Sequence, residues 1–244
     1  MNSELETLVV YDLDDTLFPN HQYYVAAKRK FIQIVLGSNT TNQQVKELSD
    51  LTEKINRANI PLYGYSTERF GLSLREAYET WQTKHKLQTD GEIASSAYKL
   101  GIGVANENEI FRTGLYEGTL EMFDLHQSRN DRLVLLTKGL EATQRMKIET
   151  LGLARYFEQI IIVPTSKEAA FSSFASYAGS KWTIGNSVKS DIIPALKYGF
   201  RGIHMDTDTW EFEKAPTPVG VATVQNMRQL REYISALPRQ IKAA

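Results

Sequence analysis

Three acidic residues stand close together at the end of an apolar segment near the N-terminus. The stretch VVYDLDDTLFPN at 9–20 places Asp12, Asp14 and Asp15 directly after three apolar residues. The apolar residues predict a buried strand, so the acids arrive where that strand leaves the core. Carboxylates that share a cleft repel one another unless a cation or a proton neutralises them. A polar turn in which Asp15 or Thr16 caps a helix is the simpler interpretation, and we weigh it against the rest of the chain.

Polar residues also follow the other predicted strands. The segments that we expect to be strands are 132–137, 159–163, 181–185 and 201–205. Helical patterns separate them, which is typical of a parallel sheet with helices on its faces. The polar residues at or after the ends of these strands are Thr137, Lys138, Lys167, Asn186 and Asp191.

These residue types together suit a metal ion and a phosphate group. Ligands of open α/β sheets bind outside the carboxyl ends of the strands, so we expect the polar residues to converge on Asp12 and Asp14. Carboxylate and amide oxygens are suited to Mg²⁺. Lysine, a hydroxyl and free N–H groups at helix N-termini suit phosphate oxygens. The set therefore predicts a magnesium ion beside a phosphorylated ligand.

A long helical stretch separates the first predicted strand from the second. A crossover between parallel strands normally needs one helix, whereas this one has room for about four. Two sequences in it, TNQQ at 41–44 and SLRE at 73–76, fit the capping-box pattern with Thr41 and Ser73 as N-caps. We therefore predict an α/β core domain of residues 1–17 and 111–244, with an inserted helical domain at 18–110 that covers the acids like a lid.

Composition excludes several classes of function. The 244 residues contain 28 Lys and Arg against 29 Asp and Glu, which gives a formal net charge of −1 and no basic surface for a nucleic-acid polymer or a membrane. Apolar runs such as IIIV at 160–163 are too short to cross a bilayer. The absence of cysteine excludes disulfides and thiol catalysis. We expect a soluble cytoplasmic protein.

The order of the polar segments resembles a known superfamily. DLDDT, a threonine that ends a strand, a lysine that opens a helix and GNSVKSD resemble the four signature motifs of the haloacid dehalogenase superfamily of hydrolases. The helical insertion is similar to the C1-type cap of that superfamily. The resemblance implies a Rossmann-like parallel sheet with an inserted α-helical cap. It further implies a magnesium-dependent phosphatase that acts on a small phosphorylated metabolite.

The resemblance also implies roles for individual residues. Asp12 would be the nucleophile that forms an aspartyl phosphate, and Asp14 the general acid and then the general base. Thr137, Lys138 and Lys167 would hold the phosphoryl oxygens.

Magnesium would be bound by Asp12, by the backbone carbonyl of Asp14 and by the fourth motif. In that motif Asn186 stands where the superfamily most often has Asp. We expect Asp191 to act as a ligand or a close anchor, with Asn186 as a co-ligand.

Several alternatives remain open at this stage. Members that displace halide from carbon lack the second Asp, so Asp14 favours phosphoryl transfer. A pyrimidine 5′-nucleotidase and a phosphomutase share the same motifs, and a receiver-like phosphoacceptor module is a distant alternative. Within PLYGYSTERF at 61–70, the residues Tyr63, Tyr65 and Arg69 are candidates for contact with the leaving group, although packing within the cap is the commoner role of such residues.

Overall fold

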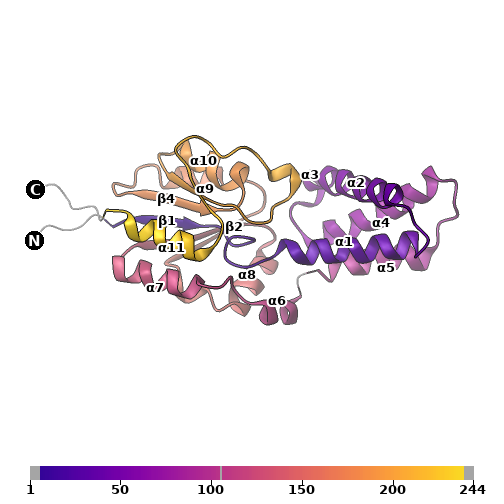
Figure 1. Ribbon diagram of the computed structural model, residues 1–244, viewed down its shortest axis with the longest axis horizontal. Helices are drawn as coiled ribbons and strands as arrows, with labels where there is room; N and C mark the ends of the chain where they lie inside the picture. The colour runs from indigo at the N-terminus through magenta and orange to yellow at the C-terminus, as the bar shows by residue number, and fades with distance from the viewer. Residues whose placement is uncertain (1–5, 105, 239–244) are drawn as a thin grey trace, which may run out of the picture. The chain divides into compact units, whose positions relative to one another are not determined.

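The chain forms two compact units. The computed structural model in Figure 1 describes residues 6–104 and 106–238. One unit contains Met1–His21 together with Ile110–Ala244, and the other contains Gln22–Glu109. The second unit begins and ends close to the bounds of the predicted insertion, 18–110. Each unit is described by itself below.

A six-stranded parallel sheet forms the centre of the first unit. Its strands follow the order β3-β2-β1-β4-β5-β6, and every neighbouring pair is parallel. The strands are β1 (Leu8–Tyr11), β2 (Arg132–Lys138), β3 (Gln159–Val163), β4 (Lys181–Gly185), β5 (Arg201–Met205) and β6 (Ala222–Val224). The predicted α/β fold with a Rossmann-like parallel sheet is confirmed. The sequence did not reveal β6, because three residues are too few to show a period.

The central strand brings the predicted site residues to one edge. All four residues of β1 are buried, as expected for a strand covered on both faces. Tyr11 pairs in register with Leu135 of β2 and with Ile184 of β4. The carboxyl ends of these three parallel strands therefore point to the same edge of the sheet, where β2 continues three residues beyond Leu135, to Lys138.

Helices cover both faces of the sheet. They are α7 (Thr119–Arg129), α8 (Glu141–Thr150), α9 (Glu168–Ser173), α10 (Ile193–Leu196) and α11 (Met227–Ala236). Leu8 and Val10 belong to a core cluster that includes Phe171 of α9. Tyr11 packs instead against Phe123 of α7, with ring centroids 6.1 Å apart. In Figure 1, α9 and α10 lie on one side of the strands and α7 and α11 lie on the other.

The region between β1 and α7 is helical. Its helices are α1 (His21–Leu36), α2 (Asn42–Ala58), α3 (Ile60–Tyr63), α4 (Thr67–Lys84), α5 (Gly91–Ile102) and α6 (Glu107–Thr113). Within the part of the chain that the structure describes, no helix has the length and apolar character that a membrane span requires.

One of the two predicted capping boxes is confirmed and the other is wrong. Thr41 caps α2, and both hydrogen bonds of its capping box with Gln44 are formed. Ser73 lies inside α4, where its hydroxyl donates to the carbonyl of Arg69 at 2.8 Å. The helix begins earlier because Ser66 accepts from the backbone N–H of Arg69 and provides the N-cap.

Helices α4 and α5 approach each other through two glycines. A Cβ atom built on Gly101 would lie 2.4 Å from the Cα atom of Gly71. A side chain at either position would push the two helices apart, so the glycines set this close packing.

Candidate active site

A tight turn follows β1 and gives Asp15 surroundings different from those of Asp12 and Asp14. Asp15 has a φ of 59°, in the left-handed region, and its N–H donates to the carbonyl of Phe18 at 2.9 Å. The Asp15 carboxylate accepts from the backbone N–H of His21, the first residue of α1, at 2.7 Å. Burial raises the pKa of Asp15 to about 8, although the bond from His21 acts in the opposite direction. The capping interpretation therefore holds for Asp15.

Asp12, Lys167 and Asp191 form the most buried charged group of the site. The Lys167 Nζ lies 2.5 Å from Asp12 Oδ1 and 2.6 Å from Asp191 Oδ1, and it is 3% exposed. The pKa of Asp12 is raised to about 7, because burial and, to a smaller extent, the charges of Asp191 and Asp14 outweigh the opposing effect of Lys167. Burial alone would lower the pKa of Lys167, but the two carboxylates outweigh it and the net change is upward.

The fourth motif is fixed by a close approach at Gly185. A Cβ atom there would lie 2.4 Å from Asp191 Oδ2, so only glycine lets this carboxylate lie against the end of β4. Asp191 belongs to a π-helical turn, Val188–Ile192, a geometry found frequently at functional sites. Its Oδ2 accepts from the N–H of Ser187 at 2.9 Å. Asp191 therefore anchors both Lys167 and the start of the turn after β4.

Thr16 connects Asp12 to Asn186. Its Oγ1 donates to Asp12 Oδ2 at 3.0 Å and accepts from the backbone N–H of Asn186 at 3.1 Å. The Asn186 Oδ1 lies 3.5 Å from the same hydroxyl, and its Nδ2 donates to the carbonyl of Asp208 at 2.8 Å. The amide oxygen of Asn186 therefore faces the region around Asp12. Thr16, the last residue of DLDDT, was not among the predicted site residues.

Two residues of α8 that the sequence did not single out contact Asp14. The Lys147 Nζ donates to both carboxylate oxygens of Asp14, at 2.8 and 2.9 Å, and Lys147 is 2% exposed. Gln144 donates to Asp14 Oδ2 at 3.2 Å and to Thr137 Oγ1 at 2.5 Å. Because Gln144 and Lys147 are three residues apart on a helix, they share one face. That spacing is the one signal in the sequence that could have predicted that Gln144 and Lys147 act at the same place.

Lys138 is held by Glu213, the last residue of the short helix Glu211–Glu213. Its Nζ lies 2.9 Å from Glu213 Oε1 and 2.7 Å from Ser190 Oγ. Glu213 Oε2 also accepts from the hydroxyls of Ser187 and Ser190, both at 2.7 Å. Burial would raise the pKa of Glu213, but Lys138 and the serine hydroxyls lower it to about 2. Glu213 therefore links the ends of β2 and β4, and Lys138 stays a predicted phosphate ligand whose ammonium has an acidic partner.

The charges of this edge favour a divalent cation. The carboxyl groups of Asp12, Asp14, Asp191 and Glu213 stand against the ammonium groups of Lys138, Lys147 and Lys167, while Asp15, whose pKa is raised to about 8, is mostly protonated at neutral pH. Among the described residues no group of three His, Cys, Asp or Glu side chains is arranged to hold a metal. A cation here would therefore also need the Asn186 oxygen and backbone carbonyls, and Mg²⁺ accepts such a set because it uses only one or two carboxylates.

The three candidates in the helical unit differ in their surroundings. Tyr63, at the end of α3, is 47% exposed. Arg69 is buried, and its guanidinium lies 5.4 Å from the centre of the Tyr65 ring. Tyr65 and Arg69 thus lie together within this unit.

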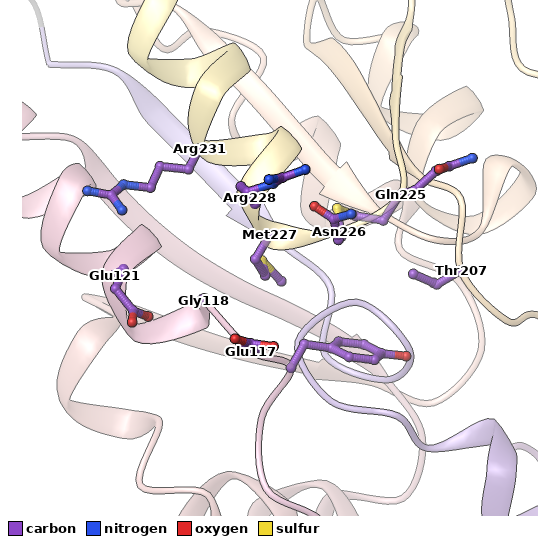
Figure 2. Close-up of a pocket in the computed structure, with 11 residues that line it drawn as sticks. Glu117, Gly118, Glu121, Thr207, Gln225, Asn226, Met227, Arg228 and Arg231 are labelled. Atoms are coloured by element: carbon purple, nitrogen blue, oxygen red, sulfur yellow. The ribbon is translucent and has the colours of Figure 1, made fainter.

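A cavity of about 530 Å³ lies beside the turn after β1. It lies between the start of α7, the end of β5 and the start of α11, and Figure 2 shows its side chains. Arg228 and Arg231 of α11 contribute two positive charges, and Glu117 and Glu121 contribute two negative ones. None of the predicted site residues lines this cavity.

Comparison with known proteins supports the fold. Neither a family model nor a curated protein matches the chain in sequence. A haloacid dehalogenase-like family hydrolase from Xanthomonas campestris is 22% identical, with a TM-score of 0.72, and the match covers 97% of this chain and 93% of that one. A magnesium-bound HAD-like hydrolase from Bacillus subtilis is 18% identical, with a TM-score of 0.61 and coverage of 96% and 100%.

Dehalogenases share this fold as well. The L-2-haloacid dehalogenase from Xanthobacter autotrophicus is 12% identical, with a TM-score of 0.56, and the match covers 96% of this chain and 100% of that one. The chain therefore has the fold of the haloacid dehalogenase-like hydrolases. The fold alone does not indicate whether the substrate is a phosphate ester or a haloacid.

Proposed function

We propose that the protein is a magnesium-dependent phosphatase that hydrolyses a small phosphate monoester through an aspartyl phosphate on Asp12. The observation that carries this proposal is the position of Asp14, which lies two residues after Asp12 and has its own buried partner, Lys147. A halide leaves carbon without a proton, so dehalogenation has no need for a second carboxyl group. An ester oxygen must be protonated as it leaves, and Asp14 can supply that proton.

The first step transfers the phosphoryl group to the protein. Asp12 attacks phosphorus, the bond between phosphorus and the ester oxygen breaks, and the leaving oxygen takes a proton from Asp14. Lys167 and Thr137 stabilise the charge on the phosphoryl oxygens.

The second step returns Asp12 to its starting form. Asp14, now ionised, accepts a proton from a water molecule as that water attacks phosphorus. The bond between phosphorus and the Asp12 oxygen breaks, which releases inorganic phosphate and leaves Asp14 protonated for the next cycle.

The residues at the site fit a magnesium ion. Asp12, the Asn186 side-chain oxygen and the backbone carbonyl of Asp14 would hold it, while Asp191 would anchor Lys167 and the turn after β4. When bound, the cation neutralises part of the excess negative charge and polarises the phosphoryl oxygens.

Two product assays test the proposal. Release of inorganic phosphate is measured with nucleotides, sugar phosphates and small phosphorylated acids, and release of chloride is measured with 2-chloropropionate. We expect phosphate release that requires Mg²⁺ and is lost in Asp12→Asn. Chloride release that is independent of Mg²⁺, with no phosphate released from any ester, would contradict the proposal.

A further inference from the structure

Asn186 is held by hydrogen bonds at three of its four polar groups. Its backbone N–H donates to Thr16 Oγ1, and its side-chain Nδ2 donates to the carbonyl of Asp208 at 2.8 Å. Its own carbonyl lies 3.1 Å from His204 Nε2. Only Oδ1 has no short contact within the described residues, since its nearest partner, Thr16 Oγ1, is 3.5 Å away. Because the one hydrogen of that hydroxyl is donated to Asp12, the Asn186 Oδ1 is available to a cation.

The Asp208 carbonyl fixes the orientation of the Asn186 amide. A carbonyl oxygen only accepts hydrogen bonds, so the side-chain atom that lies 2.8 Å from it must be the amide nitrogen. The amide oxygen then faces Thr16 and Asp12. An aspartate at position 186 would place a second acceptor against the Asp208 carbonyl, with no hydrogen between the two oxygens. These surroundings therefore favour asparagine at this position.

His204 of β5 holds the backbone of Asn186 through one tautomer of its ring. Because the Asn186 carbonyl only accepts, the His204 Nε2 must carry a proton to bond with it. The other ring nitrogen, Nδ1, lies 2.8 Å from Thr217 Oγ1. In a neutral ring Nδ1 accepts from this hydroxyl, and the bond from Thr217 keeps the ring proton on Nε2.

Asp208 and Thr217 both belong to the connection between β5 and β6. Thr207 of the same connection donates to the carbonyl of Asp15 at 2.5 Å. Asp15 directly follows Asp14, whose own carbonyl is a proposed ligand of the cation. The connection between β5 and β6 therefore contacts both the turn after β1 and the turn after β4.

We propose that the connection between β5 and β6 positions the cation-binding oxygens of the site and determines that position 186 is an asparagine. Thr217 and His204 are positioning residues, because the hydroxyl fixes the ring and the ring fixes the backbone of Asn186. The Asp208 carbonyl then turns the Asn186 Oδ1 toward the cation. The inference rests on the proposed function, since it concerns the Mg²⁺ that the phosphatase would use.

Calorimetric titration with Mg²⁺ alone, without any ester, tests the inference apart from turnover. Contacts that orient a metal ligand typically contribute about 10- to 100-fold to metal affinity. We therefore expect Thr217→Val, which keeps the shape but removes the hydroxyl, and His204→Phe each to weaken Mg²⁺ binding by about tenfold or more. Thr217→Ser should restore most of the wild-type affinity. His85→Phe is the matched control, since His85 is exposed at the end of α4, and it should leave the affinity unchanged.

Nitrogen NMR of the His204 ring gives a readout that a general loss of packing would not move. We expect a proton on Nε2 in the wild-type protein, with this preference lost in Thr217→Val and regained in Thr217→Ser. A wild-type ring without a proton on Nε2 would overturn the inference. Thermal unfolding shows which variants are folded, and the two Thr217 variants decide the question if His204→Phe is not.

Asn186→Asp tests the role of the Asp208 carbonyl. By charge alone, an added carboxylate would tighten the binding of Mg²⁺. We expect binding that is weaker than in the wild-type protein by about fivefold or more, because a carboxylate cannot donate to the Asp208 carbonyl. Binding as tight as in the wild-type protein, or tighter, would overturn the selection of asparagine.

Failure of this inference can be told from failure of the phosphatase proposal. Unchanged Mg²⁺ affinity in both Thr217→Val and His204→Phe would overturn the inference even if the wild-type protein releases phosphate. No binding of Mg²⁺ by the wild-type protein would overturn it as well. The expected losses of Mg²⁺ affinity, together with no phosphate release from any ester, would overturn the phosphatase proposal alone.

Discussion

Replacement of Glu213 by Gln should destabilise the protein in a pH-dependent manner. The pKa of Glu213 is lowered from 4.5 to about 2 by Lys138 and two serine hydroxyls. One unit of pKa corresponds to about 1.4 kcal/mol, so the ionised side chain contributes about 3 kcal/mol to the free energy of unfolding. Because the folded-state pKa lies below the unfolded value, this contribution is complete above pH 4.5 and disappears as the pH falls toward 2.

Urea denaturation at several pH values measures this effect. At pH 7 we expect Glu213→Gln to lower the free energy of unfolding by at most about 3 kcal/mol. At pH 3 this loss should be about 2 kcal/mol smaller. Glu211→Gln is the control, since Glu211 lies in the same short helix but has a side chain that is 75% exposed. The control should differ from wild type by less than about 0.5 kcal/mol.

A constant difference between wild type and Glu213→Gln from pH 7 to pH 3 would refute the reasoning. It would mean that Glu213 does not gain its stability from the charges and hydrogen bonds around Lys138. A pH-dependent loss of equal size in Glu211→Gln would point to a general effect of net charge.

Three further predictions concern Asp14, its partner and the helical unit. Asp14→Asn should reduce phosphate release from alkyl esters by a larger factor than from aryl esters, because a phenol needs less protonation; equal losses in the two kcat/KM series would exclude Asp14 as the acid. Lys147→Met should lower kcat/KM by about 10- to 100-fold because Asp14 loses two charge-assisted hydrogen bonds. Lys147→Arg should retain more activity than Lys147→Met, and a fully active Met variant would contradict this prediction. Gly101→Ala should lower the free energy of unfolding by about 1–3 kcal/mol in urea denaturation, whereas Gly91→Ala, with open space around its added methyl group, should not.

The sequence revealed the parts of the fold that depend on local pattern. Strands such as 159–163 are continuous apolar runs, and their alternation with helices predicted a parallel sheet. The start of α4 could not be predicted in the same way, because two segments, STER at 66–69 and SLRE at 73–76, each begin with a serine that could cap the helix and have charged residues after it. The structure favours Ser66, since the helix gains two more turns of packing from the earlier start.

The site was predictable only where its residues follow a strand. Asp12 and Lys167 are 155 positions apart. Asp12 comes directly after a strand and Lys167 opens the helix that follows another strand, so both lie at the same edge of the sheet. Lys147 and Glu213 have no such position. Lys147 lies within α8, and Glu213 ends the short helix Glu211–Glu213. Neither the spacing nor the composition of the sequence indicates that Lys147 reaches Asp14 or that Glu213 reaches Lys138.

The most direct test of the account is chemical trapping of the phosphorylated residue. The wild-type protein is mixed with p-nitrophenyl phosphate and Mg²⁺ and quenched in acid within a single turnover. It is then treated with borohydride, which reduces an aspartyl phosphate to homoserine. The account predicts homoserine at position 12 by peptide mass spectrometry, and none in Asp12→Asn. Rapid release of phosphate with no modification at position 12, or with homoserine at another aspartate, would contradict the assignment of Asp12 as the nucleophile.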